Sequence, residues 1–349
     1  MKSNFGKEER ERYTRQSAFH GIGKAGQKKL AKSRVMILGC GGLGSASASI
    51  LARAGIGYLK LVDRDFLELN NLQRQILYEE HDVKEGLPKV IAAQRQIERI
   101  NSTVHVEPVI SDVNRFNIEA LIADVDLVID AADNFETRFL LNDACVKHNR
   151  TWIYGAAIES FGLSMNIIPG KTACLRCVMD NIPQPGSVPT CETVGVLASI
   201  VCIIASIQSA EAIKILLDKE DEINRSLISI DIWNNSYQAI TIEKEKIQNN
   251  CPVCNQRWFE FLEGKQGSAF TALCGRNAVQ ILPFKETSLD LAKLAINLSG
   301  LGVVKVNEFL IRFEIEGYEL IIFPDSRAIV KGTTDAGVAR SLYSKYVGN

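Results

Sequence analysis

Four of the nine cysteines fall into two closely spaced pairs. Cys174 and Cys177 form CLRC, and Cys251 and Cys254 form CPVC. Thiolates at this spacing can bind one tetrahedral zinc ion, and two such pairs complete a structural four-sulfur site. Four free thiols or a redox CxxC motif are the alternatives. We interpret the pairs as a zinc site that ties two distant segments together, because the charged N-terminus does not resemble a secretory signal that would favour disulfides.

A glycine-rich turn follows the first strongly apolar segment of the chain. Gly39, Gly41 and Gly44 have the GxGxxG spacing, between a predicted strand and a predicted helix. Glycines let the backbone approach a phosphate, and the N-terminus of the following helix favours its charge. Asp63 ends the next predicted strand, where an acid would bond a ribose hydroxyl. Alone, this motif is typical of an NAD-dependent oxidoreductase, and a P-loop is excluded because no GK[ST] follows.

Charged residues follow this turn in an order that a dehydrogenase does not need. Arg74 lies in NNLQRQ, Lys89 in GLPK, and Asp133 in DAADN. A dehydrogenase leaves its pyrophosphate intact, whereas cleavage of a triphosphate requires cations near the developing charge and a carboxylate for magnesium. Singly, the two cations could be solvated surface charges and the acid a helix cap. Their ordered combination favours triphosphate chemistry.

The segments around these residues alternate between strand and helix patterns. The predicted strands are 34–38, 58–62, 104–109, 125–130 and 151–155, and the predicted helices are 44–54, 88–100, 118–123 and 137–148. This alternation predicts an α/β fold, a Rossmann-like, mostly parallel sheet with helices on both faces. The apolar stretch 194–207 is too short to span a membrane and predicts a buried helix.

A polar linker near 262–268 indicates a division into a domain of residues 1–262 and a second of residues 268–349. The second has its own pattern, namely a strand at 271–281, a helix at 289–298, a hairpin or meander at 303–323 and a helix at 336–346. We expect a small α+β domain that supports docking or dimerisation, or that binds a protein partner.

The charges of the chain nearly cancel, with 40 basic and 41 acidic side chains. Without a basic excess, nucleic acids and anionic membranes are not the expected partners, which leaves proteins and small molecules. With no signal peptide recognised, we expect a cytoplasmic protein.

The motifs GCGGLG, NLQRQ, GLPK and DAADN, the early RYTRQ and the two CxxC pairs together resemble the ThiF/MoeB/HesA family, most closely its ThiF branch. This bacterial family is related to ubiquitin-activating enzymes. The resemblance implies a homodimer that uses Mg-ATP to adenylate the C-terminal glycine of a ubiquitin-like sulfur carrier, releasing pyrophosphate. The expected carrier is of the ThiS type, in thiamine biosynthesis. The alternatives are a MoaD carrier in molybdenum cofactor synthesis and, in a different class, a Rossmann oxidoreductase or a non-catalytic scaffold.

The resemblance also implies roles for single residues around the nucleotide. The backbone of the turn would lie against the phosphates, Asp63 would take the ribose hydroxyls, and Asp133 would ligate magnesium. The residues that would line the turn or bind the phosphates are Gly39, Gly41, Gly42, Gly44, Asn71, Arg74, Gln75 and Lys89.

Two further residues are implied to act in catalysis. Arg15, in RYTRQ, matches an arginine that dimers of the family insert into the neighbouring subunit's site. Cys191, in PTCETVGV, would link to the carrier during transfer of sulfur from a donor of cysteine desulfurase or rhodanese type. A thiol at a helix N-terminus is a stronger nucleophile because its pKa is lowered, although Cys191 could also be a helix-start residue without chemistry.

Overall fold

In this computed structural model the described residues are 11–179, 191–242, 251–265, 272–273, 277–281 and 289–347. Contacts divide the chain into two units, one from residues 1–183 and 196–266 and the other from residues 184–195 and 267–349. Each unit has its own sheet.

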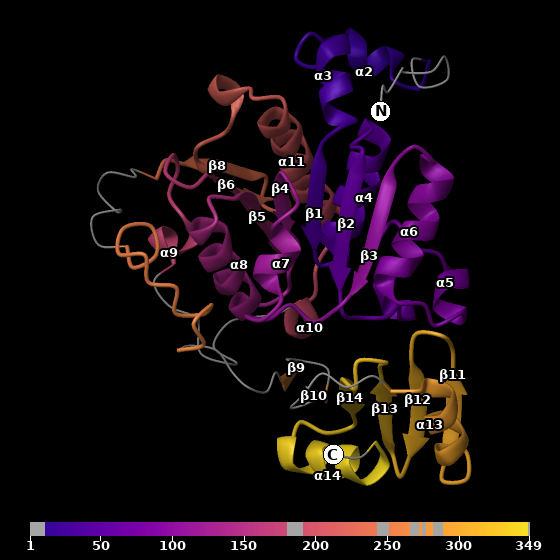
Figure 1. The fold of residues 1–349 in the computed structure, drawn as a ribbon. Coiled ribbons are helices and arrows are strands. Elements are labelled where there is room, and N and C mark those ends of the chain that lie inside the picture. Colours follow the sequence, from indigo (N-terminus) through magenta and orange to yellow (C-terminus); the bar gives the residue numbers. More distant parts are fainter. Residues whose placement is uncertain are drawn as a thin grey trace. The chain divides into compact units, whose positions relative to one another are not determined.

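An eight-stranded sheet forms the centre of the first unit, with the strand order β3-β2-β1-β4-β5-β6-β7-β8 (Figure 1). Its strands are β1 (Arg34–Leu38), β2 (Tyr58–Asp63), β3 (His105–Ile110), β4 (Leu127–Asp130), β5 (Thr151–Ile158), β6 (Phe161–Ile167), β7 (Leu227–Asp231) and β8 (Ser236–Ile240). The strands from β3 to β5 are parallel, whereas β6, β7 and β8 each run antiparallel to their neighbour. The predicted mostly parallel sheet is confirmed.

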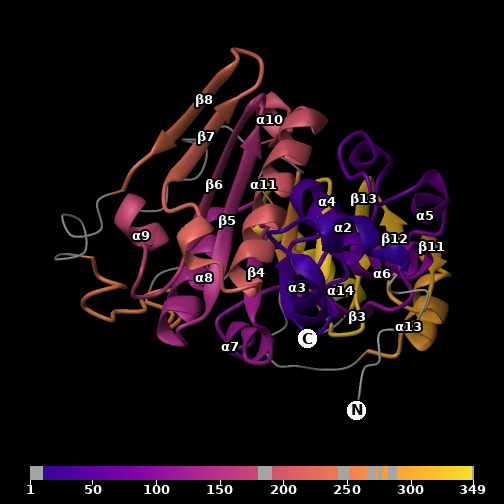
Figure 2. The ribbon, with the colours of Figure 1, turned by 90° about the horizontal axis from the view of Figure 1, so that it is seen from above.

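Helices flank both faces of this sheet, as the alternating pattern predicts (Figure 2). One face carries α4 (Gly42–Ala54), α6 (Lys89–Ile100) and α11 (Ala198–Leu216), and the other carries α7 (Ile118–Ile122) and α8 (Phe135–Lys147). The shorter helices of this unit are α2 (Thr14–Ala18), α3 (Gly23–Leu30), η1 (Leu69–Asn71), α5 (Glu80–Lys84), α9 (Leu175–Val178) and η2 (Glu220–Glu222).

Strand β1 is buried on both faces. Met36 and Leu38 pack into the core shared with Phe139 of α8, while Val35 and Ile37 are also fully inaccessible to solvent. Burial on both faces is typical of a central parallel strand and explains the uninterrupted apolar sequence of this segment. The chain therefore reaches the glycine turn from a fully packed part of the sheet.

Helix α11 begins later than the apolar stretch that predicts it. Gly195, with φ of 82°, separates it from the short helix α10 (Cys191–Val194), which groups with the second unit. By length and composition α11 could cross a membrane, but about half of it is buried inside the protein. Gln208 in its middle donates hydrogen bonds to the carbonyls of Asp130 and Ile153, so the helix is fixed to the sheet. The predicted burial therefore holds for one face only.

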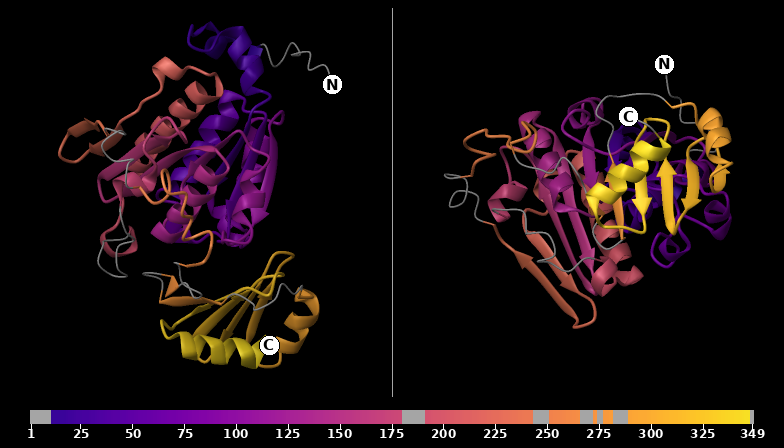
Figure 3. Two further views of the ribbon diagram at one scale, coloured as in Figure 1. Left: turned by 60° about the vertical axis from the view of Figure 1, so that its left-hand side comes forward. Right: turned by 90° about the horizontal axis from the view of Figure 1, so that it is seen from below.

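The second unit contains a six-stranded antiparallel sheet with the order β11-β12-β13-β14-β10-β9. Its strands are β9 (Ala272–Leu273), β10 (Ala278–Ile281), β11 (Val303–Val306), β12 (Ile311–Ile315), β13 (Tyr318–Ile322) and β14 (Ala328–Lys331). Helices α13 (Leu291–Leu298) and α14 (Ala336–Tyr346) pack on one face of it (Figure 3). The predicted α+β character is confirmed, although residues 271 and 274–276 of the predicted first strand lie outside the described residues.

Candidate functional site

Two glycines of the turn are required by close packing. Gly39 has φ of 92°, and a Cβ atom there would lie 2.5 Å from the carbonyl oxygen of Ala131. A Cβ atom on Gly44 would lie only 1.8 Å from the carbonyl oxygen of Gly39. The first turn of α4 therefore lies directly against the end of β1, which is the close approach that this glycine spacing allows.

Gly41 differs, because packing does not require it. The nearest atom to a Cβ added there would be Nε2 of Gln75 at 3.9 Å, whereas a Cβ on Gly42 would meet Val201 at 2.9 Å. Gly41 immediately precedes α4, whose first backbone N–H groups have no partner within the helix. Open space beside the N-terminus of a 13-residue helix is suited to a phosphate group.

Asp63 fixes this turn to the end of β2. One carboxylate oxygen accepts a hydrogen bond from the backbone N–H of Cys40 at 2.6 Å, and the other accepts one from Asp65 at 2.7 Å. Burial raises the pKa of Asp63, and the nearby Lys89 ammonium opposes that shift. The carboxylate lies at the nucleotide turn, as expected, and its bond to a ribose stays a prediction.

Lys89 is held at the same edge of the sheet rather than exposed on the surface. It begins α6, and its Nζ lies 3.1 Å from the carboxylate of Asp65, with only 4 % of the lysine side chain exposed. Its backbone N–H also donates to the carbonyl oxygen of Asp65 at 2.9 Å. Interpretation of this lysine as a solvated surface charge is therefore wrong.

The NNLQRQ segment carries three more of the expected residues, and two of them, Arg74 and Gln75, lie beside the turn. Asn71 is buried and closes a capping box with Glu68. Arg74 is half-buried, donates to the carbonyl of Asn70 at 3.0 Å, and has its Cγ 3.8 Å from where a Cβ of Gly42 would lie. Gln75 is 2 % exposed, and its Oε1 has no hydrogen-bond partner among the described residues. A buried amide oxygen without a partner beside an open anion site is typical of a position that contacts a ligand or water.

Asp133 lies after β4 with an exposed side chain, which accepts a hydrogen bond from Asn134 Nδ2 at 3.2 Å. Asn134 is the residue that caps α8, because its Oδ1 accepts from the backbone N–H of Thr137 at 2.8 Å. The alternative of Asp133 as the helix cap is therefore wrong. An exposed carboxylate at the carboxyl edge of a sheet can bind a metal ion, and its binding of magnesium stays a prediction.

A buried ion pair, absent from the expected site, holds this DAADN turn in place. Arg138 contacts the fully buried Asp130 at 3.3 Å and donates to the carbonyls of Ala132 and Gly155 at 2.7 and 3.0 Å. Burial raises the pKa of Asp130 to about 6, although Arg138 opposes the shift. Arg138 thus has a structural role in holding this turn, which its position in the sequence does not indicate.

Arg15 is not brought to the turn within one chain. It is exposed on α2, and the adjacent Gln16 donates to the carbonyl of Ala54, the last residue of α4, at 2.8 Å. The glycine turn lies at the opposite end of α4, and 13 residues of helix span about 20 Å. Figure 1 shows α2 and α3 at one end of the first unit.

Cys191 begins α10 in the second unit and its side chain is exposed. That exposure suits a reactive thiol better than a packed one. Its catalytic role stays a prediction.

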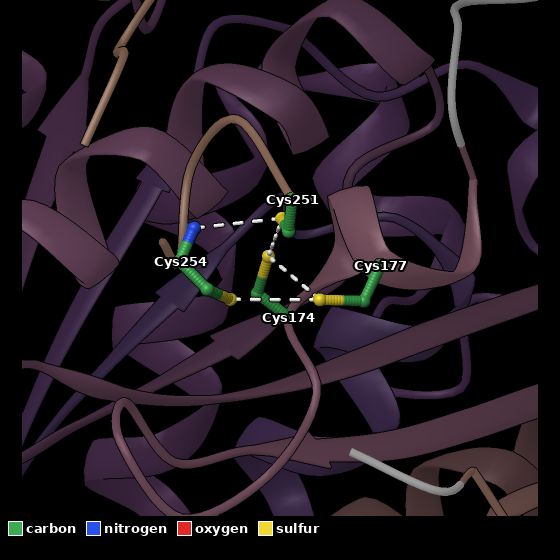
Figure 4. Close-up of side chains that lie close together, drawn as sticks. All are labelled: Cys174, Cys177, Cys251 and Cys254. Atoms are coloured by element: carbon green, nitrogen blue, oxygen red, sulfur yellow. Dashed lines mark hydrogen bonds between the residues drawn. The ribbon is translucent and has the colours of Figure 1, made fainter. Parts of the chain in front are cut away.

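The two CxxC pairs converge, although 73 residues separate them (Figure 4). The Sγ atom of Cys174 lies 3.8 Å from that of Cys177 and 3.7 Å from that of Cys251, and Cys177 lies 3.5 Å from Cys254. Sulfurs around one tetrahedral zinc are about 3.8 Å apart, since each Zn–S bond is about 2.3 Å. The cluster therefore has the geometry and the donor set of a structural metal site, consistent with zinc.

Neighbouring polar residues of α8 fix both arms of this cluster. Asn142 accepts from the backbone N–H of Leu175 at 2.9 Å and donates to Cys174 Sγ at 3.7 Å. Asp143 accepts from the backbone N–H of Phe261 at 3.0 Å. Burial raises the pKa of Asp143 to about 7. Hydrogen bonds such as that from Asn142 to Cys174 Sγ commonly orient the ligands of a metal site.

Comparison with known proteins decides the family. The ThiF family model matches residues 13–253, which include the glycine turn, Lys89, Asp133 and three of the four clustered cysteines. The chain belongs to the ThiF family. The resemblance predicted from the motifs is thereby confirmed.

The similar proteins include enzymes with named activities. The chain is 42 % identical to the sulfur carrier protein ThiS adenylyltransferase of Bacillus subtilis over 338 residues, 97 % of this chain and 99 % of that protein. It is 36 % identical to the SAMP-activating enzyme E1 of Haloferax volcanii, over 72 % of this chain and 92 % of that protein. A crystal structure of E. coli MccB with ATP matches with a TM-score of 0.59 and 26 % identity, covering 70 % of this chain and 74 % of that one.

Proposed function

We propose that this chain is an ATP-dependent adenylyltransferase that activates the C-terminal glycine of a ThiS-type sulfur carrier for thiamine biosynthesis. The observation that carries the proposal is the similarity to the Bacillus subtilis enzyme, because it extends over 97 % of the chain and thus through the second unit. A MoaD-type carrier is the second candidate. Its support is weaker, since the 37 % identical MOCS3 adenylyltransferase and sulfurtransferase of Anopheles gambiae is matched over 70 % of this chain and 55 % of its own length.

The nucleotide would bind along the carboxyl edge of the sheet. Its phosphates would lie over Gly41 at the N-terminus of α4, where no described side chain fills the space. Asp63 would accept hydrogen bonds from the ribose hydroxyls, and Oε1 of Gln75, which has no partner among the described residues, offers a further hydrogen-bond acceptor to the nucleotide. Asn71 would contribute its buried amide to the same wall.

In the reaction, a carboxylate oxygen of the carrier attacks the α-phosphorus. The bond from that phosphorus to the bridging oxygen breaks, its electron pair leaves with pyrophosphate, and an acyl-adenylate forms. Lys89 and Arg74 stabilise the negative charge that develops, which is the largest contribution that a preorganised site can make. Asp133 would hold Mg²⁺, which supplies charge neutralisation on the phosphates when bound.

The four-cysteine cluster would hold Zn²⁺ for stability rather than for chemistry. Four thiolates fill a tetrahedral shell and leave no position for substrate, which distinguishes structural from catalytic zinc.

A homodimer would complete the nucleotide site. Helix α11 lies beside the glycine turn near its start, where Val201 is next to Gly42, and beside α3 at its C-terminal cap, where Leu217 is next to Gly26. Its outward stripe, Ser199, Ile203, Ser206 and Ala210, is exposed and uncharged. A two-fold axis across the middle of α11 would bury this stripe and bring α2 of one subunit to the glycine turn of the other. Arg15 of the partner subunit would then contact the phosphates.

Sulfur transfer would follow adenylation. A cytoplasmic sulfur donor of cysteine desulfurase or rhodanese type would convert Cys191 to a persulfide. The terminal sulfur would attack the carbonyl carbon of the acyl-adenylate, AMP would leave, and a reducible acyl disulfide would join carrier and enzyme.

Exchange of labelled pyrophosphate into ATP tests the activity. We expect exchange with a ThiS-type carrier ending in Gly-Gly and none when its last glycine is deleted. Exchange supported only by a MoaD-type carrier would favour the second candidate. Binding of NADH without binding of ATP would instead indicate an oxidoreductase and overturn the proposal.

A further inference from the structure

Arg64, between the two acids of VDRD, lies among carboxylates at the nucleotide edge. Its Nη1 contacts Asp112 at 2.7 Å and its Nε lies 4.0 Å from Asp65, while only 16 % of its side chain is exposed. Burial lowers the pKa of this arginine, but Asp112, Asp65 and Asp133 outweigh it, so the net pKa is raised. The guanidinium is thus charged, largely desolvated and electrostatically coupled to the proposed magnesium ligand.

The sheet order places this side chain beside the glycine turn. Arg64 directly follows β2, and Asp133 follows β4. Between these two strands lies β1, which ends in the turn that begins at Gly39. Asp63, the residue before Arg64, accepts a hydrogen bond from the backbone N–H of Cys40 in this turn, so Arg64 lies at the same edge of the sheet as the space over Gly41.

We propose that Arg64 binds the β- and γ-phosphates of ATP and the pyrophosphate that leaves, and that Asp112 positions it for this contact. The inference rests on the proposed function and deepens it. A guanidinium has five N–H donors, so that it can contact a carboxylate and a phosphate together.

The different positions of the three cations at this edge support the assignment of Arg64 to the outer phosphates. Lys89 is held by Asp65 at the start of α6, and Arg74 lies over Gly42. Arg64 contacts Asp112 and interacts electrostatically with Asp133, the carboxylate that would hold magnesium. Magnesium bound there would supply charge neutralisation on the phosphates. When the bond to the α-phosphorus breaks, negative charge grows on the bridging oxygen of pyrophosphate, and a desolvated cation stabilises it strongly.

Three ligands separate this role from others, because AMP lacks the two outer phosphates. The affinities of Arg64→Gln for ATP, Mg-pyrophosphate and AMP are measured by calorimetry on the full-length protein. We expect the affinities for ATP and pyrophosphate to fall about 10- to 100-fold, as for loss of charge-assisted hydrogen bonds, while AMP binds within about twofold of wild type. Asp112→Asn should weaken the same two ligands by a smaller factor.

Arg95→Gln is the matched control, since Arg95 forms an exposed pair with Glu85 at 2.7 Å on α6 and should change none of the three affinities. If Arg64→Gln weakens AMP as much as ATP, or weakens neither, the inference is wrong. Should Arg64→Gln fail to fold, Arg64→Lys replaces it, because lysine keeps the charge but lacks the several N–H donors of the guanidinium. If Arg64→Lys binds pyrophosphate as tightly as wild type, the inference is also wrong. Failure of carrier-dependent exchange in the wild-type protein would instead refute the proposed function itself.

Discussion

Replacing Gly41 by alanine should weaken ATP binding strongly without unfolding the protein. An added Cβ atom would meet no described atom closer than 3.9 Å, so packing tolerates the methyl group. The backbone at Gly41, with φ of −74°, needs no left-handed conformation. The same methyl group would occupy the space into which the phosphates must move to reach the N-terminus of α4.

The size of the change in ATP affinity and of the change in the free energy of unfolding can both be estimated. Loss of one charge-assisted hydrogen bond between a backbone N–H and phosphate costs about 1.5–3 kcal/mol, which corresponds to a roughly 10- to 150-fold weaker affinity for ATP. The free energy of unfolding should change by no more than about 1 kcal/mol, because replacing a glycine at a compatible position also restricts the unfolded chain. Gly44→Ala reverses this pattern, since its Cβ atom would lie 1.8 Å from the carbonyl oxygen of Gly39 and force α4 away from β1.

Calorimetric titration with ATP and a thermal melt of the same preparations measure the two effects. Gly300→Ala is the control, because a Cβ atom there meets nothing within 4 Å and the residue lies in the second unit. It should match wild type in both assays. ATP affinity equal to wild type in Gly41→Ala would refute the placement of the phosphates, and a melting temperature as low as that of Gly44→Ala would refute the packing argument.

Three further outcomes are expected. Cys177→Ser should lose the metal, measured by elemental analysis, and melt about 5 °C lower or more, because a structural metal contributes directly to folding; full metal content would contradict the site. Asp133→Asn should cut pyrophosphate exchange about 10²- to 10³-fold, and equimolar mixing with Arg15→Ala should restore about a quarter of wild-type activity through mixed dimers. No recovery in proven mixed dimers would remove Arg15 from the partner's site. Cys191→Ala should keep exchange but lose the reducible adduct with the carrier, and loss of exchange would place Cys191 in the first step.

The sequence predicted well the parts of the fold where one local pattern decides the outcome. The strand 34–38 is apolar after Arg34 because β1 is buried on both faces, and its predicted bounds are those observed. The helix after the glycine turn begins two residues earlier than predicted, at Gly42, because the structure continues the helix through glycines that packing requires. The four-cysteine cluster was also predictable from a local pattern, because each CxxC spacing places two sulfurs where they can bind the same metal ion.

The antiparallel strands β6, β7 and β8 were not predicted from the local sequence pattern, and for β8 its exposure explains why. Four of the five residues of β8 are exposed, so that Ser236–Ile240 shows neither a buried run nor an alternation of apolar and polar residues. Arg64 was not predicted as a site residue, because its contact with Asp112 and its interaction with Asp133 join segments that are distant in sequence. The pairing of Arg138 with buried Asp130 was not predicted, because it depends on packing that sequence spacing does not show.

Helix α8 connects the metal cluster to the DAADN turn, and its contacts indicate how far loss of the metal would spread. Its second half carries Asn142 and Asp143, which hold the two arms of the cluster. Its first turn is fixed independently, by the cap at Asn134 and by the bonds of Arg138 to Asp130 and the neighbouring carbonyls. Because the contacts that fix the first turn do not involve the cluster, loss of the metal should lower the stability of the whole unit while leaving the geometry at Asp133 intact until the unit unfolds.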